Sequence, residues 1–443
     1  MYLSSIDRPG ADAAPTAGRS RLRGIKAVGG NVFALGTVSL LTDVSAEMVT
    51  AILPVYLVVG LSMSPLAYGT LDGLHTGATA LLRLVGGYVA DRSRRPKTVA
   101  GIGYALSALA KLGLLAVGRS AGAIGLVIAV DRAGKGLRTA PRDALITLSA
   151  PPHALARAFG VHRAMDSFGA FLGPLVALAV LAAAGQAFDA VLVTSFCVAA
   201  LGVVVLVLFV RDRHDERPPA AVATPREALT LLRSAPVRRL VVAACLLGFA
   251  VIGDGFVYLL LQRREEVSLS TFPLLAVGTS LVYLLLAVPV GALADRVGRL
   301  PVVLGGYTAL LGVYLLLSGS LHGMPLVALV LVLYGTFYAA TDGVLMALAG
   351  PVLPAHLRTT GLALIQTGQA LAYLASSVLF GLAWQLWGPA TAVRCAAALV
   401  VPVVAATAFL LIVRPGTRTD TGTGSHSDSG THTDTDTDTE ETA

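Results

Sequence analysis

Long apolar runs separated by short polar connections make up most of this chain. Each run is long enough to cross the ~30 Å hydrocarbon core of a bilayer as a helix rising 1.5 Å per residue. The pattern predicts an all-α polytopic membrane protein with twelve transmembrane helices. The expected helices are 31–59, 67–90, 98–118, 122–148, 157–184, 189–210, 239–261, 270–290, 300–319, 323–349, 359–386 and 389–413.

One run departs from the apolar pattern, because residues 130–146 read VDRAGKGLRTAPRDALI. Its ionisable residues are Asp131, Arg132, Lys135, Arg138, Arg142 and Asp143. All of these except Arg132 and Asp143 lie along one stripe of a helix with 3.6 residues per turn. A charge facing lipid costs about 3 kcal/mol on insertion scales. The stripe is therefore expected to face other helices or a water-filled cavity.

Composition and charge support a membrane protein over a soluble one. Only 13% of the residues are charged, whereas soluble domains carry about 25%. The net charge of +7 does not indicate nucleic-acid binding, because the basic residues cluster in connections beside apolar runs. The 29 arginines against four lysines, with abundant Ala and Gly, suggest a bacterial genome of high GC content. The expected location is the bacterial plasma membrane.

The distribution of basic residues among the connections predicts the orientation. Arg and Lys are abundant after the second and eighth runs and between the sixth and seventh. The connections at 60–66, 185–188 and 320–322 contain none, although Arg119, Arg394 and the pair Arg263/Arg264 are exceptions to the trend. By the positive-inside rule both termini are cytoplasmic, which requires an even number of spans.

Composition also divides the chain into segments. Residues 1–29 are polar and basic, and 414–443 are acidic and of low complexity, so both are expected to be disordered. Residues 211–237 contain several prolines and are expected to form a cytoplasmic linker. The linker separates a six-helix bundle at 30–210 from a second at 238–413.

The two predicted bundles contain matching sequences. GGYVADRSRRPK after the second run corresponds to VGALADRVGRLP after the eighth, so Asp91 matches Asp295. APRDALITLSAPPHALARAFG corresponds to ATDGVLMALAGPVLPAHLRTTG, so Asp143 matches Asp342. Two six-helix halves repeated in parallel are typical of transporters, which bind substrate between the halves. The repeat also argues against an intramembrane enzyme or a receptor, because neither needs two matched gates.

At these residues the chain resembles the major facilitator superfamily, and the resemblance covers roughly 30–413. Its loop signature G-x-x-x-D-R-x-G-R is matched by Gly291, Asp295, Arg296, Gly298 and Arg299. The N-terminal copy contains Gly87, Asp91, Arg92 and Arg95 but has Arg94 where glycine is usual.

Two further motifs support the resemblance. The segment from Arg132 to Gly136 is similar to the family's R-x-x-x-G signature in the fourth helix. Gly169, Gly173 and Pro174 resemble the G-x-x-x-G-P signature associated with antiporters, although GxxxG also serves plain helix packing. The resemblance implies a drug/proton antiporter-like transporter.

The first predicted helix carries Asp43 and Glu47 on one face, near the membrane midplane and at the depth of the charged stripe. We predict that they pair with some of Arg132, Lys135 and Arg163. One interpretation is a static salt-bridge network that sets helix register. The other is a titrating carboxylate, because burial favours its neutral form and a nearby arginine its charged form. By resemblance to drug exporters, Asp43 or Glu47 would carry the proton and Arg132 would modulate it.

The candidate residues fall into three sets. The predicted proton and substrate cavity contains Asp43, Glu47, Asp131, Arg132, Lys135, Arg163, Asp166, Asp254 and Gln366. The predicted gates contain Gly87, Asp91, Arg92, Arg138, Arg142, Asp143, Gly291, Asp295, Arg296, Gly298, Arg299 and Asp342. The antiporter motif contains Gly169, Gly173 and Pro174.

These residues predict a secondary active transporter working by alternating access, a proton-coupled exporter of a small organic or drug-like solute. An importer or uniporter of an anionic solute is the alternative, because basic residues outnumber acids in the fourth and fifth helices. An intramembrane enzyme or a receptor is a more remote alternative. We expect no enzymatic activity, cofactor, metal or nucleic-acid partner, and a monomer that binds its solute, protons and the lipid bilayer.

Overall fold

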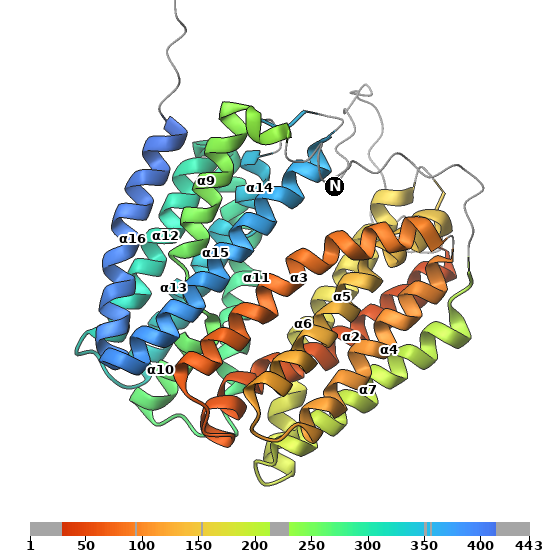
Figure 1. The fold of residues 1–443 in the computed structure, drawn as a ribbon, viewed down its shortest axis with the longest axis horizontal. Coiled ribbons are helices and arrows are strands. Elements are labelled where there is room, and N and C mark those ends of the chain that lie inside the picture. Colours follow the sequence, from red (N-terminus) through yellow and green to blue (C-terminus); the bar gives the residue numbers. More distant parts are fainter. Residues whose placement is uncertain are drawn as a thin grey trace, which may run out of the picture.

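The computed structural model describes residues 29–93, 95–151, 154–212, 230–349, 352–354 and 357–412, without the side chains of 80, 81, 83–93, 156, 358 and 359. Within these ranges every regular element is a helix. Figure 1 shows the helices in two groups side by side. The termini predicted to be disordered and most of the predicted linker lie outside the described residues. The predicted linker ends early, because α9 (Ala235–Phe249) begins inside it.

The first group contains the six spans predicted before the linker. They are α2 (Gly30–Val55) with its π-helical continuation η1 (Tyr56–Gly60), α3 (Pro65–Ser93), α4 (Pro96–Ala116), α5 (Ala121–Ser149), α6 (Leu155–Ala183) and α7 (Phe188–Phe209). All six are observed as predicted, with ends within about three residues.

The second group contains the remaining spans. They are α9 with α10 (Asp254–Glu265), α11 (Pro273–Val297), α12 (Arg299–Ser318), α13 (Met324–Thr341) with α14 (Val344–Ala349), α15 (Arg358–Trp387) and α16 (Pro389–Ile412), preceded by the short η3 (Leu231–Arg233). We call the side where α2 begins and α16 ends the terminal side, and the opposite side the loop side (Figure 1).

Two helices predicted to be continuous are broken. The predicted helix 239–261 is interrupted at residues 250–253, and the predicted helix 323–349 is interrupted at Asp342 and Gly343. Tyr314 of α12 reaches the first break, where its hydroxyl accepts a hydrogen bond from the Ile252 amide at 3.0 Å and donates to the Ala250 carbonyl at 3.3 Å. Non-helical backbone at membrane depth is tolerated where protein or a cavity satisfies its polar groups.

The described helices include ten that are long and apolar enough to cross a membrane, and α3 and α5 are not among them. The six ionisable residues of α5 set it apart from the apolar spans, but close packing shields them. A Cβ on Gly134 would lie 2.9 Å from the Ser107 amide of α4, and one on Gly136 would lie 2.7 Å from the Leu82 carbonyl carbon of α3. Small residues let helix backbones approach this closely in membranes. The charged stripe is therefore enclosed by protein, as the sequence predicted.

Candidate substrate cavity

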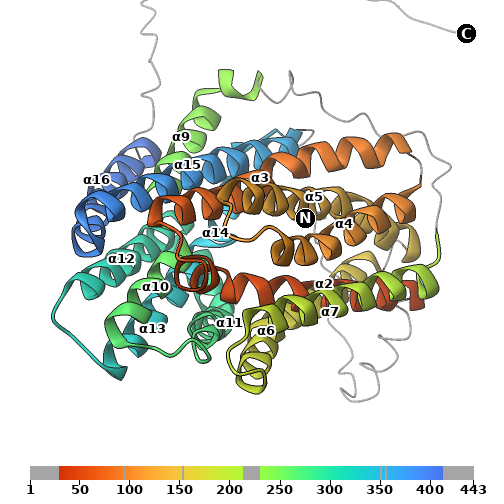
Figure 2. The same cartoon turned by 60° about the horizontal axis from the view of Figure 1, so that its bottom comes forward.

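The two groups of helices meet tightly along α3 and α15, which run side by side in both views (Figures 1 and 2). A Cβ on Gly73 of α3 would lie 3.0 Å from the Leu374 carbonyl oxygen. A Cβ on Gly381 of α15 would lie 3.1 Å from the Leu66 Cα atom. No larger residue fits at either glycine without moving a helix.

A cluster of aromatic rings closes the loop side of this contact. Tyr68 of α3 packs edge-on against Phe256 of α10, with ring centroids 4.8 Å apart. Phe256 in turn packs against Phe380 of α15 at 4.8 Å, and Trp384 lies one turn further along α15. All four side chains are buried. The cluster therefore joins the two halves and separates their interior from the loop side.

Two cavities lie between the halves on the terminal side of this cluster. The first has a volume of about 480 Å³ and is lined by α2, α3 and α6 of one half and α10, α11 and α15 of the other. The second, of about 520 Å³, extends past α13 and α14 to Gln366 of α15. They share Thr76, Asp254 and Tyr373, so they adjoin. Each is large enough for a small organic molecule.

The lining of the two cavities is acidic and aromatic. Its carboxylates are Glu47, Asp72, Asp254 and Asp342, and its tyrosines are Tyr68, Tyr258, Tyr283, Tyr307, Tyr338 and Tyr373. The described lining contains no lysine or arginine. The composition as a whole is poor in aromatic residues, at 6%, but half of the 12 tyrosines are gathered here.

Asp254 is the first residue of α10 and lies at the break between α9 and α10. Its carboxylate accepts hydrogen bonds from the hydroxyls of Tyr334, at 2.6 Å, and Tyr338, both on α13. The amino end of a helix also favours a carboxylate, because its first amides have no partner within the helix. The break therefore places an acidic group on the wall that both cavities share.

Asp72 connects the two halves. This α3 carboxylate accepts hydrogen bonds from Ser377 at 2.7 Å and from Tyr373 at 3.1 Å, both on α15. These bonds must break or rearrange if α3 and α15 separate. Asp72 therefore couples the cavity lining to the contact that closes the loop side.

We expect Tyr373→Phe to weaken closure on the loop side. Losing one hydrogen bond of about 1 kcal/mol should shift the open-to-closed ratio roughly fivefold. Double electron–electron resonance between labels at the loop-side ends of α3 and α15 would measure the two populations. Tyr283→Phe is the matched control, because it removes a bond to Asp342 at 2.9 Å within one half. Equal shifts in both variants would contradict the coupling.

Glu47 differs from the other acids of the lining. Among the described residues it has no hydrogen-bond partner and no cation within ion-pair distance, and it faces the first cavity. A Cβ on Gly173 of α6 would lie 3.0 Å from the Glu47 carbonyl carbon, and one on Gly169 would lie 3.0 Å from the Leu40 Cα atom. These two glycines of the predicted antiporter motif bring α6 against α2, and Pro174 lines the cavity.

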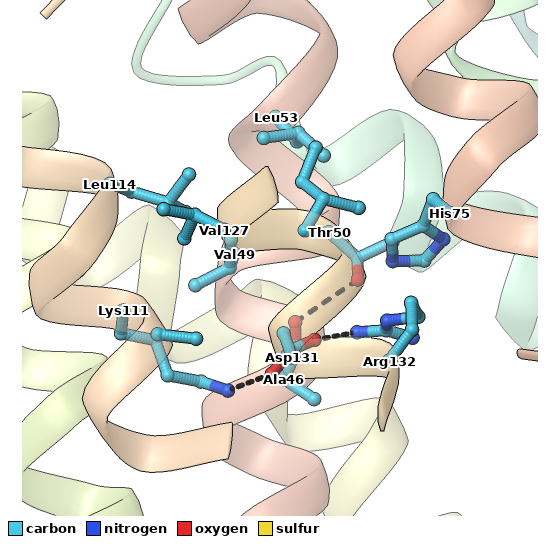
Figure 3. A pocket seen from close by; sticks show the side chains of 12 residues that line it. Ala46, Val49, Thr50, Leu53, His75, Lys111, Leu114, Val127, Asp131 and Arg132 are labelled. Carbon is cyan, nitrogen blue, oxygen red and sulfur yellow. Dashed lines mark hydrogen bonds and ion pairs between the residues drawn. The ribbon is translucent and has the colours of Figure 1, made fainter. Parts of the chain in front are cut away.

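Asp131, the acid predicted at cavity depth on α5, is held by partners on α4 and α5. Asp131 accepts hydrogen bonds from Ser107 at 2.5 Å and Lys111 at 3.0 Å on α4, and it pairs with its neighbour Arg132 (Figure 3). Lys111, Asp131 and Arg132 line a space of about 30 Å³ within the first half, which is room for a water molecule but not for an organic solute. His75 borders both this space and the first cavity. Residues of α2 line the same small space, and Asp131 borders this space rather than either large cavity.

The predicted partners of Asp43 are wrong. Its carboxylate pairs with Arg138 at 3.7 Å rather than with Arg132, Lys135 or Arg163. Arg138 also lies over the Tyr104 ring, 4.7 Å from its centroid. Arg132 pairs with Asp131 instead. The sequence therefore predicted the wrong arginine of α5 as the partner of Asp43.

Asp43 belongs to a larger charged group on the terminal side of the first cavity. Arg142 lies 3.0 Å from Asp143 and 3.9 Å from Asp166. The Asp166 carboxyl is itself in hydrogen-bonding contact with Asp43. The group therefore contains acids and bases in near balance.

The structure distributes the predicted cavity residues unevenly. Glu47, Asp254 and Gln366 line the two cavities, and Asp131 and Arg132 line the small internal space. Asp43, Lys135, Arg163 and Asp166 line none of these three spaces. Sequence reasoning left the tyrosines of the lining out of the predicted cavity, because single aromatic residues in apolar runs carry no pattern that separates lining from core.

The predicted gates are described only in part. Gly87, Asp91 and Arg92 belong to the portion of α3 whose side chains the structure does not describe. In the second copy, Gly298 links α11 to α12 with φ of +101°, which a residue with a side chain rarely adopts. Arg299 donates to the Ala347 carbonyl of α14 at 2.5 Å, which ties this loop to the segment after the second break. Asp342 lies at that break and lines the second cavity.

Twelve helical spans in two halves, with a polar cavity between them, define a membrane transporter. A family model described as Major Facilitator Superfamily matches residues 35–272 and 256–433. The chain belongs to the major facilitator superfamily. An uncharacterized MFS-type transporter of Methanocaldococcus jannaschii is 29% identical over 365 residues, which cover 80% of this chain and 89% of the relative.

Solved structures share the fold. The nucleoside transporter NupG superposes with a TM-score of 0.74 at 14% identity, covering 87% of this chain and 100% of that one. A POT family transporter in complex with 5-aminolevulinic acid superposes with a TM-score of 0.69 at 13% identity, covering 87% and 96%. At such identities the likeness extends to the fold and not to the solute.

Proposed function

We propose that this transporter is a proton-coupled exporter of a small organic solute, and that Glu47 carries the proton. The observation that carries the proposal is the position of Glu47 on the cavity wall with no ion-pair partner among the described residues. A carboxylate with no salt bridge to break can gain or lose a proton as its exposure changes. Because Glu47 faces the cavity, its protonation can also depend on whether a solute is bound there.

Asp43 is a weaker candidate for the proton, because it already pairs with Arg138 and contacts Asp166. The charges that act on Glu47 are those of Lys135 and Arg132 on α5, Asp166 on α6 and Asp254 on α10. The Arg132 Nε atom is buried and has no hydrogen-bond partner among the described residues. This supports the modulating role proposed for Arg132.

We also propose that the terminal side faces the cytoplasm of a bacterial cell. Two of the exceptions to the positive-inside rule, Arg263 and Arg264, make specific contacts within the protein. Arg264 donates to the carbonyls of Leu317, Gly319 and Leu321 at 2.6–2.7 Å, where it caps the end of α12. Arg263 lies over the Trp384 ring at 5.2 Å. With this orientation the structure corresponds to an inward-facing state, sealed on the outside by the aromatic cluster.

The alternative, transport of an anionic solute, has less support. It was motivated by the bases of the fourth and fifth helices, and no lysine or arginine is found in the described lining of the two large cavities. Arg132 does have a free donor, but the adjoining space of about 30 Å³ is too small for an organic anion.

The proposed function can be tested in proteoliposomes. A screen for compounds that raise the unfolding temperature would identify a bound solute. Adding that solute to vesicles with an imposed pH gradient should dissipate the gradient, and the gradient should drive the solute uphill. Flux that runs only downhill, at a rate unaffected by the gradient, would establish a uniporter instead.

A further inference from the structure

Two groups of charged residues can be distinguished in the described helices, those in ion pairs outside the large cavities and the carboxylates that line the cavities. Four buried bases of the first half each lie within 4 Å of an acid outside the two large cavities. The pairs are Lys111 and Arg132 with Asp131, Arg138 with Asp43, and Arg142 with Asp143 and Asp166. The acids of these pairs are consequently unavailable to a solute. Lys135 forms no such pair among the described residues, and its charge and that of Arg132 act on Glu47.

Three carboxylates of the cavity, in contrast, have only neutral hydrogen-bond partners among the described residues. Asp72 binds hydroxyls of Ser377 and Tyr373, Asp254 binds hydroxyls of two tyrosines, and Asp342 binds the hydroxyl of Tyr283. A hydroxyl stabilises an ionised carboxylate but does not cancel its charge. Removing a charge from water without a counter-ion costs free energy. A cation bound in the cavity would therefore stabilise these ionised carboxylates.

The walls between these carboxylates are suited to an organic cation rather than to a metal ion. Tyr258 and Tyr283 from one half and Phe171 from the other line the first cavity with the acids. Aromatic faces attract a cation through their quadrupole and cover its apolar groups. Among the described residues no group of three or more His, Cys, Asp or Glu is placed to hold a metal ion.

We propose that the solute bound in this cavity is an organic cation, a positively charged nitrogen or phosphorus centre with an apolar body. Glu47 and Asp254 supply the charge from opposite halves, and Tyr258 supplies an aromatic face. The proposal rests on the proposed function for the statement that the cavity is the transport site. It deepens that function by assigning the charge of the solute.

Two probes of nearly equal shape and opposite charge test the assignment. Tetraphenylphosphonium and tetraphenylborate would each be titrated into the purified full-length protein in a neutral detergent, with binding measured by equilibrium dialysis against protein-free micelles. The phosphonium should bind saturably and at least about tenfold more tightly than the borate. Equal affinities, tighter binding of the borate, or no saturable binding of the phosphonium would overturn the proposal.

Variants locate the bound cation. Glu47→Gln and Asp254→Asn, which keep side-chain size, should each weaken phosphonium binding at least about tenfold. Tyr258→Leu should weaken it about threefold or more through the lost aromatic face. Glu266→Gln and Asp189→Asn are matched controls, because both residues are exposed and lie outside both cavities. Controls that weaken binding as much as the cavity variants would place the cation elsewhere and refute the assignment.

This test is independent of proton coupling, because it measures binding without a gradient. If the protein binds the phosphonium but transports solute independently of pH, the proposed cation site stands and the proposed proton coupling is refuted. A protein coupled to protons that prefers the borate would retain the coupling and lose the cation site.

Discussion

Glu47→Gln is expected to lower solute flux driven by a pH gradient at least about a hundredfold, which corresponds to ~2.7 kcal/mol in the driven step. Glutamine cannot carry a proton, but it has nearly the same shape as a protonated glutamic acid. The cavity and the packing of α2 against α6 at Gly173 should therefore persist. Counterflow, in which labelled solute exchanges for unlabelled solute without net proton movement, should continue.

Both fluxes would be measured on the same batch of proteoliposomes, with Glu266→Gln as the matched control on the loop side. Asp43→Asn tests the competing assignment. If Asp43→Asn abolishes the gradient-driven flux and Glu47→Gln does not, the proton belongs to the group formed by Asp43, Asp166 and Arg138. Loss of counterflow in Glu47→Gln would mean that the side chain is required for solute binding or for the conformational change itself.

Asp131→Asn is expected to destabilise the protein by about 3–5 kcal/mol, because it leaves two buried cations without their anion. The side chains of Lys111 and Arg132 are only 4% and 8% exposed, and Asp131 is the acid that pairs with both. The asparagine could still accept one hydrogen bond but could not offset either charge. Removing one member of a buried ion pair costs more than the pair contributes when intact.

The loss would be measured as a shift in unfolding by a denaturing detergent, with the helical signal followed by circular dichroism. Asp143→Asn is the matched control, because Asp143 is 43% exposed and its pair with Arg142 should contribute less than about 1 kcal/mol. Adding Lys111→Met to Asp131→Asn should recover part of the stability by removing one unpaired charge. A double variant no more stable than Asp131→Asn alone would show that charge imbalance is not the cause.

The apolar runs determined the number, length and order of the spans, because a helix must match the thickness of the bilayer wherever it occurs. This is why the ends of nine predicted helices agree with those observed to within about three residues, whereas α11 ends seven residues later than predicted. The break at residues 250–253 escaped prediction because these residues are as apolar as their neighbours. Their backbone leaves the helix only because Tyr314, some sixty residues away in the chain, satisfies its polar groups.

The charged stripe of α5 was also evident from the sequence, since six ionisable residues cannot face lipid at a tolerable cost. The ion-pair partners of these residues were not evident from the sequence. Arg132 and Arg138 are six residues apart, about 1.7 helical turns, and which acid each one meets depends on how α5 is positioned against its neighbours. Only the packing of Gly134 and Gly136 against α4 and α3 sets that position, and it gives Asp131 to Arg132 and Asp43 to Arg138.

By itself, the sequence determined a twelve-span transporter of two related halves, because hydropathy and the repeated motifs are local properties of the chain. The tertiary structure decided which charges remain exposed to a solute. It pairs four buried bases of the first half with acids outside the cavity, and it gathers carboxylates and tyrosines from five helices onto one cavity. Electrostatic pairing depends on distances of a few ångströms between distant segments, and no periodicity along one segment specifies such distances.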